Sequence, residues 1–77
     1  MNTYTRYDLT QFGARLRRGR LDKNLTQRKL AQIVGIDQHY ISDYEIKGRK
    51  PTLLHLCLIA SVLGLPVGYL LGGKYYE

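Results

Sequence analysis

The feature that most constrains the fold is a pair of short amphipathic helices separated by a glycine in the middle of the chain. Thr26 can cap the first helix, which ends at Gly35, a residue that takes a left-handed conformation at little cost. Asp37 can cap the second helix, which is predicted to run from Gln38 to Glu45. Because so few residues separate them, the second helix is expected to cross the first closely.

Three further helices are expected on either side of this pair. Asp8 can cap the first of them, which is predicted to end near Asn24. Thr52 can cap a leucine-rich helix that Gly64 closes, and a last short helix is expected near residues 67–71. No segment is a strong candidate for a strand. The expected fold class is therefore all-α, a compact domain of five helices.

The length of the chain allows a single domain. A chain of 77 residues buries only about 60 per cent of the surface that its unfolded form exposes. We expect one domain over residues 1–77, made of an N-terminal arm (1–7), a helical core (9–71) and a C-terminal tail (72–77). In the fourth helix, the core face is predicted to consist of Leu53, Leu56, Ile59, Ala60 and Leu63.

The basic residues are concentrated in one part of the chain. Residues 1–50 hold eleven Lys and Arg against five Asp and Glu, a balance of +6, whereas residues 51–77 hold only Lys74 and Glu77. A one-sided basic excess suits a polyanion such as nucleic acid or an anionic membrane surface. Nucleic acid is therefore a candidate partner.

Several other classes of protein are disfavoured by the sequence. No apolar run is long enough to span a membrane, and the N-terminus lacks the apolar region of a secretory signal, so a cytoplasmic location is expected. The single cysteine, Cys57, cannot form an internal disulfide, and no metal or cofactor is expected. No catalytic set of side chains is evident, so an enzyme is not expected.

The pair of helices has the residues that a close crossing requires. Ala31 is small where the second helix would pass, and Gly35 allows the turn that follows. Ile36, Ile41 and Tyr44 can lock the second helix onto the first. The opposite face of that helix then presents polar side chains to solvent, namely Gln38, His39, Ser42 and Asp43.

The segment TQRKLAQIVGIDQHYISDYE, followed by KGRKP, resembles the helix-turn-helix family of the lambdoid phage repressors and Cro. The resemblance extends from about Leu9 to Leu71 and implies binding to double-stranded DNA through the major groove. It implies that the residues contacting base edges are Gln38, His39, Ser42, Asp43 and Gln27, and that those contacting phosphates are Thr26, Lys47, Arg49 and Lys50. It also implies a structural ion pair between Arg20 and Glu45.

Less specific interpretations stand beside these roles. His39 can be an ordinary exposed residue. Asp43 can pair with Arg28 or Lys47, because a carboxylate facing DNA is repelled by phosphate unless it meets a cytosine amino group. His55 and Cys57 are expected to be packing residues.

The fourth helix carries a second apolar stripe of Leu54, Leu58 and Val62 behind its core face. An exposed stripe of this kind usually marks an interface, so these residues, with Val67, Tyr69 and Leu70, are predicted to bury against a second subunit. The alternative is that Tyr75 and Tyr76 fold back over the stripe. The leading hypothesis is a transcriptional regulator that acts as a homodimeric repressor on a dyad-symmetric operator. The alternative function is a protein-interaction module that binds a partner through this stripe.

Overall fold

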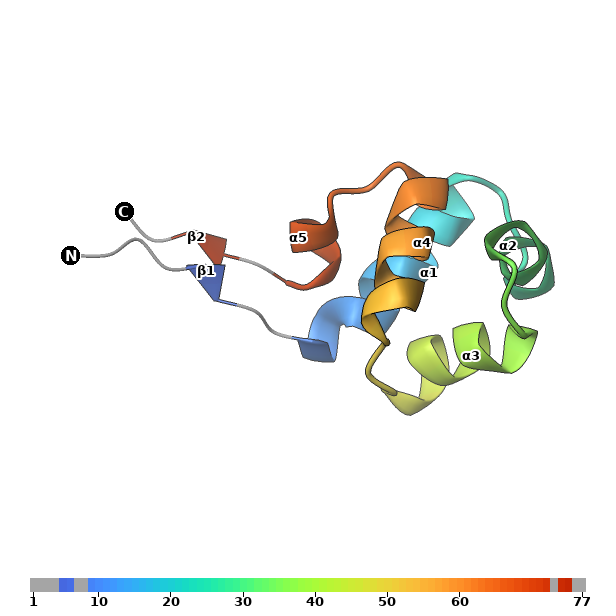
Figure 1. Cartoon of the computed structure of the whole chain (residues 1–77), viewed down its shortest axis with the longest axis horizontal. Helices are drawn as coiled ribbons and strands as arrows, with labels where there is room; N and C mark the ends of the chain where they lie inside the picture. Colours follow the sequence, from blue (N-terminus) through green and yellow to red (C-terminus); the bar gives the residue numbers. More distant parts are fainter. Residues whose placement is uncertain (1–4, 7–8, 73, 76–77) are drawn as a thin grey trace.

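Five helices make up the body of the protein in the computed structural model, which describes residues 5–6, 9–72 and 74–75 (Figure 1). The short turn η1 (Leu9–Gln11) leads into the first helix, and the π-helical segment η2 (Asp43–Lys47) continues the third. The predicted all-α fold class is confirmed. The helices are α1 (Phe12–Asp22), α2 (Gln27–Val34), α3 (Gln38–Ser42), α4 (Leu53–Leu63) and α5 (Val67–Leu70).

Local hydrogen bonds start three of these helices where the sequence predicts. The side-chain oxygens of Thr26, Asp37 and Thr52 each accept a hydrogen bond from a backbone N–H group in the first turn, at 2.9 to 3.1 Å. At the end of α2, Gly35 adopts a φ of 84°, a left-handed conformation that strains residues with a side chain. The predicted cap of the first helix, Asp8, lies outside the described residues.

The core lies where α1, α4 and α5 meet the α2–α3 pair. α1 packs against η2, α4 and α5, whereas α2 packs against α3 and α4. The ring of Phe12 meets the ring of Tyr44 edge-on, with 5.4 Å between the ring centroids. The largest fully buried side chains are Tyr44, Phe12, Leu16, Leu30, Ile41, Ile59 and Leu70.

Two predictions about apolar residues are wrong. Leu53 is predicted to lie in the core, but its side chain is 75% exposed, because at the first residue of α4 no neighbouring helix covers it. Leu70 is predicted to contact a second subunit, but it is 0% exposed and belongs to the core of its own chain. α5 is a single turn, and it directs Leu70 inward against the cluster while Val67 and Tyr69 stay exposed.

A short antiparallel pairing, which the sequence pattern does not predict, joins the two ends of the chain. Strand β1 (Thr5–Arg6) pairs with β2 (Lys74–Tyr75), with Thr5 opposite Tyr75 and Arg6 opposite Lys74. Figure 1 shows the pair projecting from the helices beyond α5, away from α4. The backbone of Tyr75 therefore does not run over the α4 stripe, and Tyr76 lies outside the described residues. Among the described residues, no helix combines the length and hydropathy needed to cross a membrane.

Candidate nucleic-acid interface

The buried face of α3 and η2 determines which side chains reach solvent. Ile41 and Tyr44 are buried in the core, as predicted, so they fix the rotation of the helix about its axis. Gln38 and His39 are exposed at the start of α3. Ser42, another predicted base contact, lies on the same segment but is half-buried and therefore less exposed than these two residues. Of the predicted base contacts on α3 and η2, those in the first turn of α3 are thus the more exposed.

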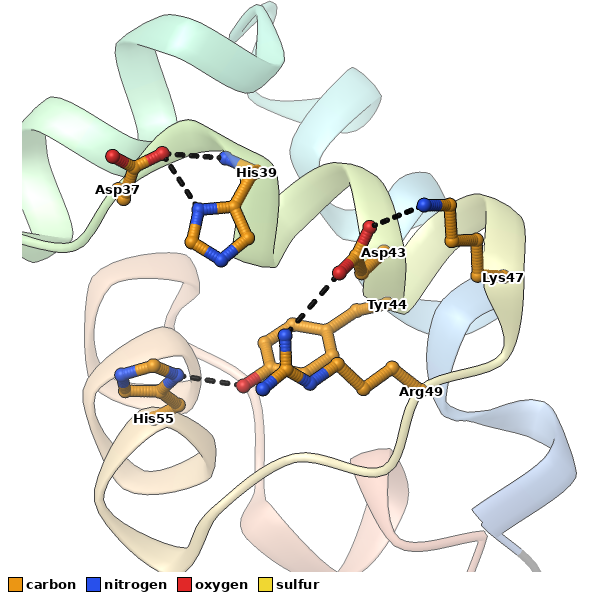
Figure 2. Close-up of polar contacts among 7 residues, drawn as sticks. All are labelled: Asp37, His39, Asp43, Tyr44, Lys47, Arg49 and His55. Carbon is orange, nitrogen blue, oxygen red and sulfur yellow. Dashed lines mark hydrogen bonds and ion pairs between the residues drawn. The ribbon is translucent and has the colours of Figure 1, made fainter.

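Asp37 holds the imidazole of His39 as well as capping α3. The Oδ1 atom of Asp37 accepts hydrogen bonds from the backbone N–H and from Nδ1 of His39, both at 2.9 Å (Figure 2). The hydrogen bond from the backbone N–H of His39, followed by the one from its ring, lowers the pKa of Asp37. Since the carboxylate is an acceptor, Nδ1 carries a proton, and Nε2 is the ring atom left to meet a ligand. The imidazole is therefore exposed to solvent, but its orientation is fixed by the hydrogen bond to Asp37.

Arg20 and Glu45 form the ion pair that the resemblance implies. Nε and Nη2 of Arg20 each lie 2.8 Å from a carboxylate oxygen of Glu45, and the two side chains are 9% and 1% exposed. Nη1 of Arg20 also donates to the carbonyl oxygen of Leu25 at 2.7 Å. The hydrogen bond to Glu45 raises the pKa of Arg20. The pair ties α1 to η2 and to the loop before α2.

Gln27 extends this ion pair to the N-terminus of α2. Its Nε2 atom donates to Oε1 of Glu45 at 3.2 Å, and the side chain is half-buried. A carboxylate can only accept, so the amide nitrogen of Gln27 must face Glu45. Gln27 is predicted to contact DNA. Its hydrogen bond to Glu45 is not predicted from the sequence, because it depends on how α2 and η2 meet.

Asp43 lies between two of the residues predicted to contact phosphate. Its carboxylate oxygens lie 3.5 Å from Nζ of Lys47 and 3.2 Å from Nη1 of Arg49 (Figure 2). The guanidinium carbon of Arg49 stands 4.8 Å from the ring centroid of Tyr40. Of the two partners predicted as alternatives for Asp43, Lys47 pairs with it and Arg28 does not among the described residues. The second partner is Arg49. Tyr40 was not predicted as a site residue.

A partly buried hydrogen bond connects η2 to α4. The hydroxyl group of Tyr44 lies 2.6 Å from Nδ1 of His55, and the ring of Tyr40 meets the same imidazole edge-on at 4.7 Å between centroids. Burial raises the pKa of Tyr44. His55 is therefore a packing residue, as expected, and it also anchors the segment that carries Asp43. The same expectation for Cys57 is wrong, because Cys57 is exposed on α4.

The remaining predicted phosphate contacts lie on the surface. Lys47, Arg49 and Lys50 are exposed in and after η2, and Lys50 forms no ion pair with any side chain among residues 9–72. Thr26 is exposed at the start of α2, where its hydroxyl oxygen is occupied by the cap. Its hydroxyl hydrogen remains available as a donor.

The predicted dimer surface on α4 and α5 is smaller than the sequence suggests. Leu54 is 64% exposed, whereas Leu58 and Val62 are half-buried and pack against the core. Val67 is exposed at the start of α5. Tyr69 is also exposed, with the guanidinium carbon of Arg15 4.6 Å from its ring centroid. Because Leu70 is buried, it takes no part in this surface.

The helix-turn-helix family model matches residues 16–70, which include all five helices apart from the first turn of α1. The chain belongs to the helix-turn-helix family. Apart from Arg15, the positions discussed above, from Arg20 to Tyr69, fall inside the match.

Relatives of this helix-turn-helix protein include curated sequences and solved structures. The SPbeta prophage-derived uncharacterized HTH-type transcriptional regulator YonR of Bacillus subtilis is 33% identical over 66 residues, which cover 86% of this chain and 61% of YonR. The chain thus spans about 60% of the length of the curated relatives it matches. The restriction-modification controller protein C.AhdI of Aeromonas hydrophila is 35% identical with a TM-score of 0.73, covering 82% of this chain and 96% of C.AhdI.

A second solved relative is SinR of Bacillus subtilis. Its N-terminal DNA binding domain is 27% identical with a TM-score of 0.77, covering 80% of this chain and 91% of the domain. SinR has also been solved in complex with DNA, and that structure is 28% identical to this chain with a TM-score of 0.74, covering 78% of this chain and 97% of the SinR chain.

Proposed function

We propose that the chain is a transcriptional regulator that binds double-stranded DNA and reads a sequence through the exposed start of α3. The observation that carries the proposal is the placement of Gln38 and His39. They project from a helix whose opposite face is locked into the core by Ile41 and Tyr44. The structure of the relative SinR in complex with DNA supports the same class of ligand.

The two exposed side chains suit base edges in the major groove. The Gln38 amide can bond to N6 and N7 of adenine, and a His39 ring held by Asp37 offers Nε2 to a base. The exposed residues Thr26, Lys47, Arg49 and Lys50 carry donors that can bind phosphates. The amide nitrogen of Gln27 is held by Glu45, and Gln27 would contact DNA beside Thr26.

The regulator is proposed to act as a homodimer that represses by occupying a dyad-symmetric operator. One reading helix contacts only a few base pairs, so two modules on half-sites about one helical turn apart supply the specificity that a single one lacks. The exposed apolar side chains of Leu54, Val67 and Tyr69 support a second copy of the chain as the partner. Repression and dimerisation are both parts of the proposal.

The exposure of Leu53 and Leu54 favours a second candidate function, a protein-interaction module that binds a partner through α4. The basic residues distinguish the two candidates. An interaction module of this kind has no need of Lys47, Arg49 and Lys50, whereas a DNA reader uses them against phosphate.

Selection from random duplex DNA tests the DNA-binding function. Wild type is expected to enrich a defined sequence, and Gln38→Ala is expected to lose about 1–3 kcal/mol of preference at one base pair. Gln32→Ala is the matched control, because Gln32 is an exposed residue of the same type on α2. Lys50→Ala is expected to weaken binding to all sequences alike and to reduce the salt dependence by about 0.9 in the log–log slope. A wild-type protein that enriches no sequence contradicts the proposal.

A further inference from the structure

Asp43 contacts Arg49 through both its backbone and its side chain. Its carbonyl oxygen accepts hydrogen bonds from the backbone N–H groups of Gly48 and, at 3.3 Å, Arg49, where η2 ends. Its carboxylate accepts a hydrogen bond from Nη1 of Arg49 at 3.2 Å. The guanidinium then lies over the face of Tyr40. Three separate contacts thus fix one arginine on the surface proposed to face DNA.

The same carboxylate neutralises a second cation. Nζ of Lys47 lies 3.5 Å from Oδ1 of Asp43, whereas Nη1 of Arg49 pairs with Oδ2. The Asp43 side chain is only 19% exposed, so its charge is screened by solvent less than that of a fully exposed carboxylate. In the free protein, two of the cations proposed to bind phosphate therefore already have a counterion.

A protein-bound counterion changes what those cations gain from DNA. Sequence-independent binding arises mainly from Lys and Arg that neutralise phosphates and release condensed ions. A cation paired with Asp43 must give up that pair, or share its donors, before it can neutralise a phosphate. The arrangement is therefore expected to weaken the sequence-independent part of DNA binding, while it keeps the Arg49 donors in one orientation against Tyr40.

We propose that Asp43 contacts no base and instead acts as a positioning residue, which holds Arg49 against Tyr40 and limits sequence-independent binding through Arg49 and Lys47. The inference rests on the proposed DNA-binding function and deepens it. It replaces the base contact predicted for Asp43 with a role in discrimination between the operator and other DNA.

The test compares Asp43→Asn with Asp22→Asn in the full chain. Asp22 is exposed on α1 and forms no ion pair with any side chain among residues 9–72, so its replacement changes the net charge equally without releasing a cation. Binding to a random-sequence duplex and to the duplex selected by wild type is measured over a range of salt concentrations. Asp43→Glu is the conservative variant that keeps the charge.

Asp43→Asn is expected to bind the random duplex about threefold more tightly than Asp22→Asn does, which corresponds to the loss of modest surface ion pairs. Its log–log salt slope is expected to be steeper by about 0.9 for each phosphate newly neutralised. Affinity for the selected duplex rises less, so the ratio between the two duplexes falls. Asp43→Glu is expected to restore most of that ratio.

Two results would overturn the inference while leaving the proposed function intact. If Asp43→Asn matches Asp22→Asn on the random duplex and loses preference at a single base pair, Asp43 reads a base. If it matches Asp22→Asn in affinity and slope on both duplexes, Asp43 is only a structural residue. A wild-type protein that binds no duplex at low salt contradicts the proposed function itself, and the role of Asp43 fails with it.

Discussion

Gly13 lies so close to the backbone carbonyl group of Tyr44 that a Cβ atom at position 13 would collide with it. Glycine within a helix costs about 1 kcal/mol relative to alanine, so position 13 in α1 weakens that helix locally. The close approach explains why glycine occupies this position in spite of its cost. It brings α1 onto η2 and allows the ring of Phe12 to meet the ring of Tyr44. The segment that carries Asp43 is thereby seated on the first helix.

Gly13→Ala is expected to destabilise the protein by about 1–3 kcal/mol, because overpacking a close backbone contact outweighs the gain in helix propensity. Gly68→Ala is the matched control, since a Cβ at that position in α5 would have no described atom within 4 Å apart from its chain neighbours and the backbone of its own helix. The control is expected to leave the free energy of unfolding unchanged or slightly raised. Urea unfolding measures both, and equal stability of the two variants would refute the close-contact argument.

The Arg20–Glu45 pair is expected to show strong coupling in a double-mutant cycle. Arg20→Leu or Glu45→Leu alone leaves a buried charge without its partner and should lower the free energy of unfolding by about 3–5 kcal/mol. The double variant buries no charge, so it should lose clearly less than the sum of the two. Urea unfolding of the four proteins gives the coupling energy. Additive losses would mean that the pair does not act as a unit.

The capping carboxylate of Asp37 is expected to make stability depend on pH. Hydrogen bonds from His39, first that of its backbone N–H, lower the pKa of Asp37 below its ordinary value of 3.8. The folded state therefore favours the ionised form, and this contribution is present above the ordinary value and lost as pH falls through the folded pKa. Asp37→Asn keeps a side chain that caps well but does not titrate.

Urea unfolding of wild type and Asp37→Asn is to be compared from about pH 6 down to about pH 2, because the Asp37 contribution is lost as the pH falls below the ordinary value and through the lower folded pKa. The free energy of unfolding of wild type should fall more steeply than that of the variant. The other carboxyl groups titrate in both proteins, so the difference isolates position 37. Parallel curves would show that Asp37 is not held as a carboxylate.

The parts of the fold that the sequence predicts are those set by local contacts. Thr26, Gly35 and Asp37 cap helices through contacts or conformations within a few residues of themselves. Their residue types therefore predict where α2 begins and ends and where α3 begins. The burial of Ile41 and Tyr44 follows from helical periodicity in the same way. The exposed start of α3 could therefore be identified without the structure.

The parts that could not be predicted depend on how distant elements meet. Gln27 reaches Glu45 across 18 positions, and Gly13 meets Tyr44 because α1 packs on η2. No local pattern encodes either contact. The prediction for Leu70 is wrong because a helix of one turn is too short for periodicity to show which side is buried.

Leu54→Glu is expected to break the proposed homodimer. Leu54 is the most exposed member of the α4 stripe, so a charge there should weaken association at least about tenfold without disturbing the core. Leu58 is less suitable for this test because it packs against the core of its own chain. Sedimentation at micromolar concentration should show wild type as a dimer and Leu54→Glu as a monomer, with the same free energy of unfolding for the monomer.

Ile33→Glu is the matched control for this experiment. Ile33 is a large exposed apolar residue on α2 and is not one of the residues of the proposed interface, so its replacement introduces the same charge outside that set. The variant should remain a dimer. If wild type is already monomeric at micromolar concentration without DNA, the α4 stripe is not a stable dimer interface. If Ile33→Glu dissociates as Leu54→Glu does, the effect comes from charge and not from the stripe.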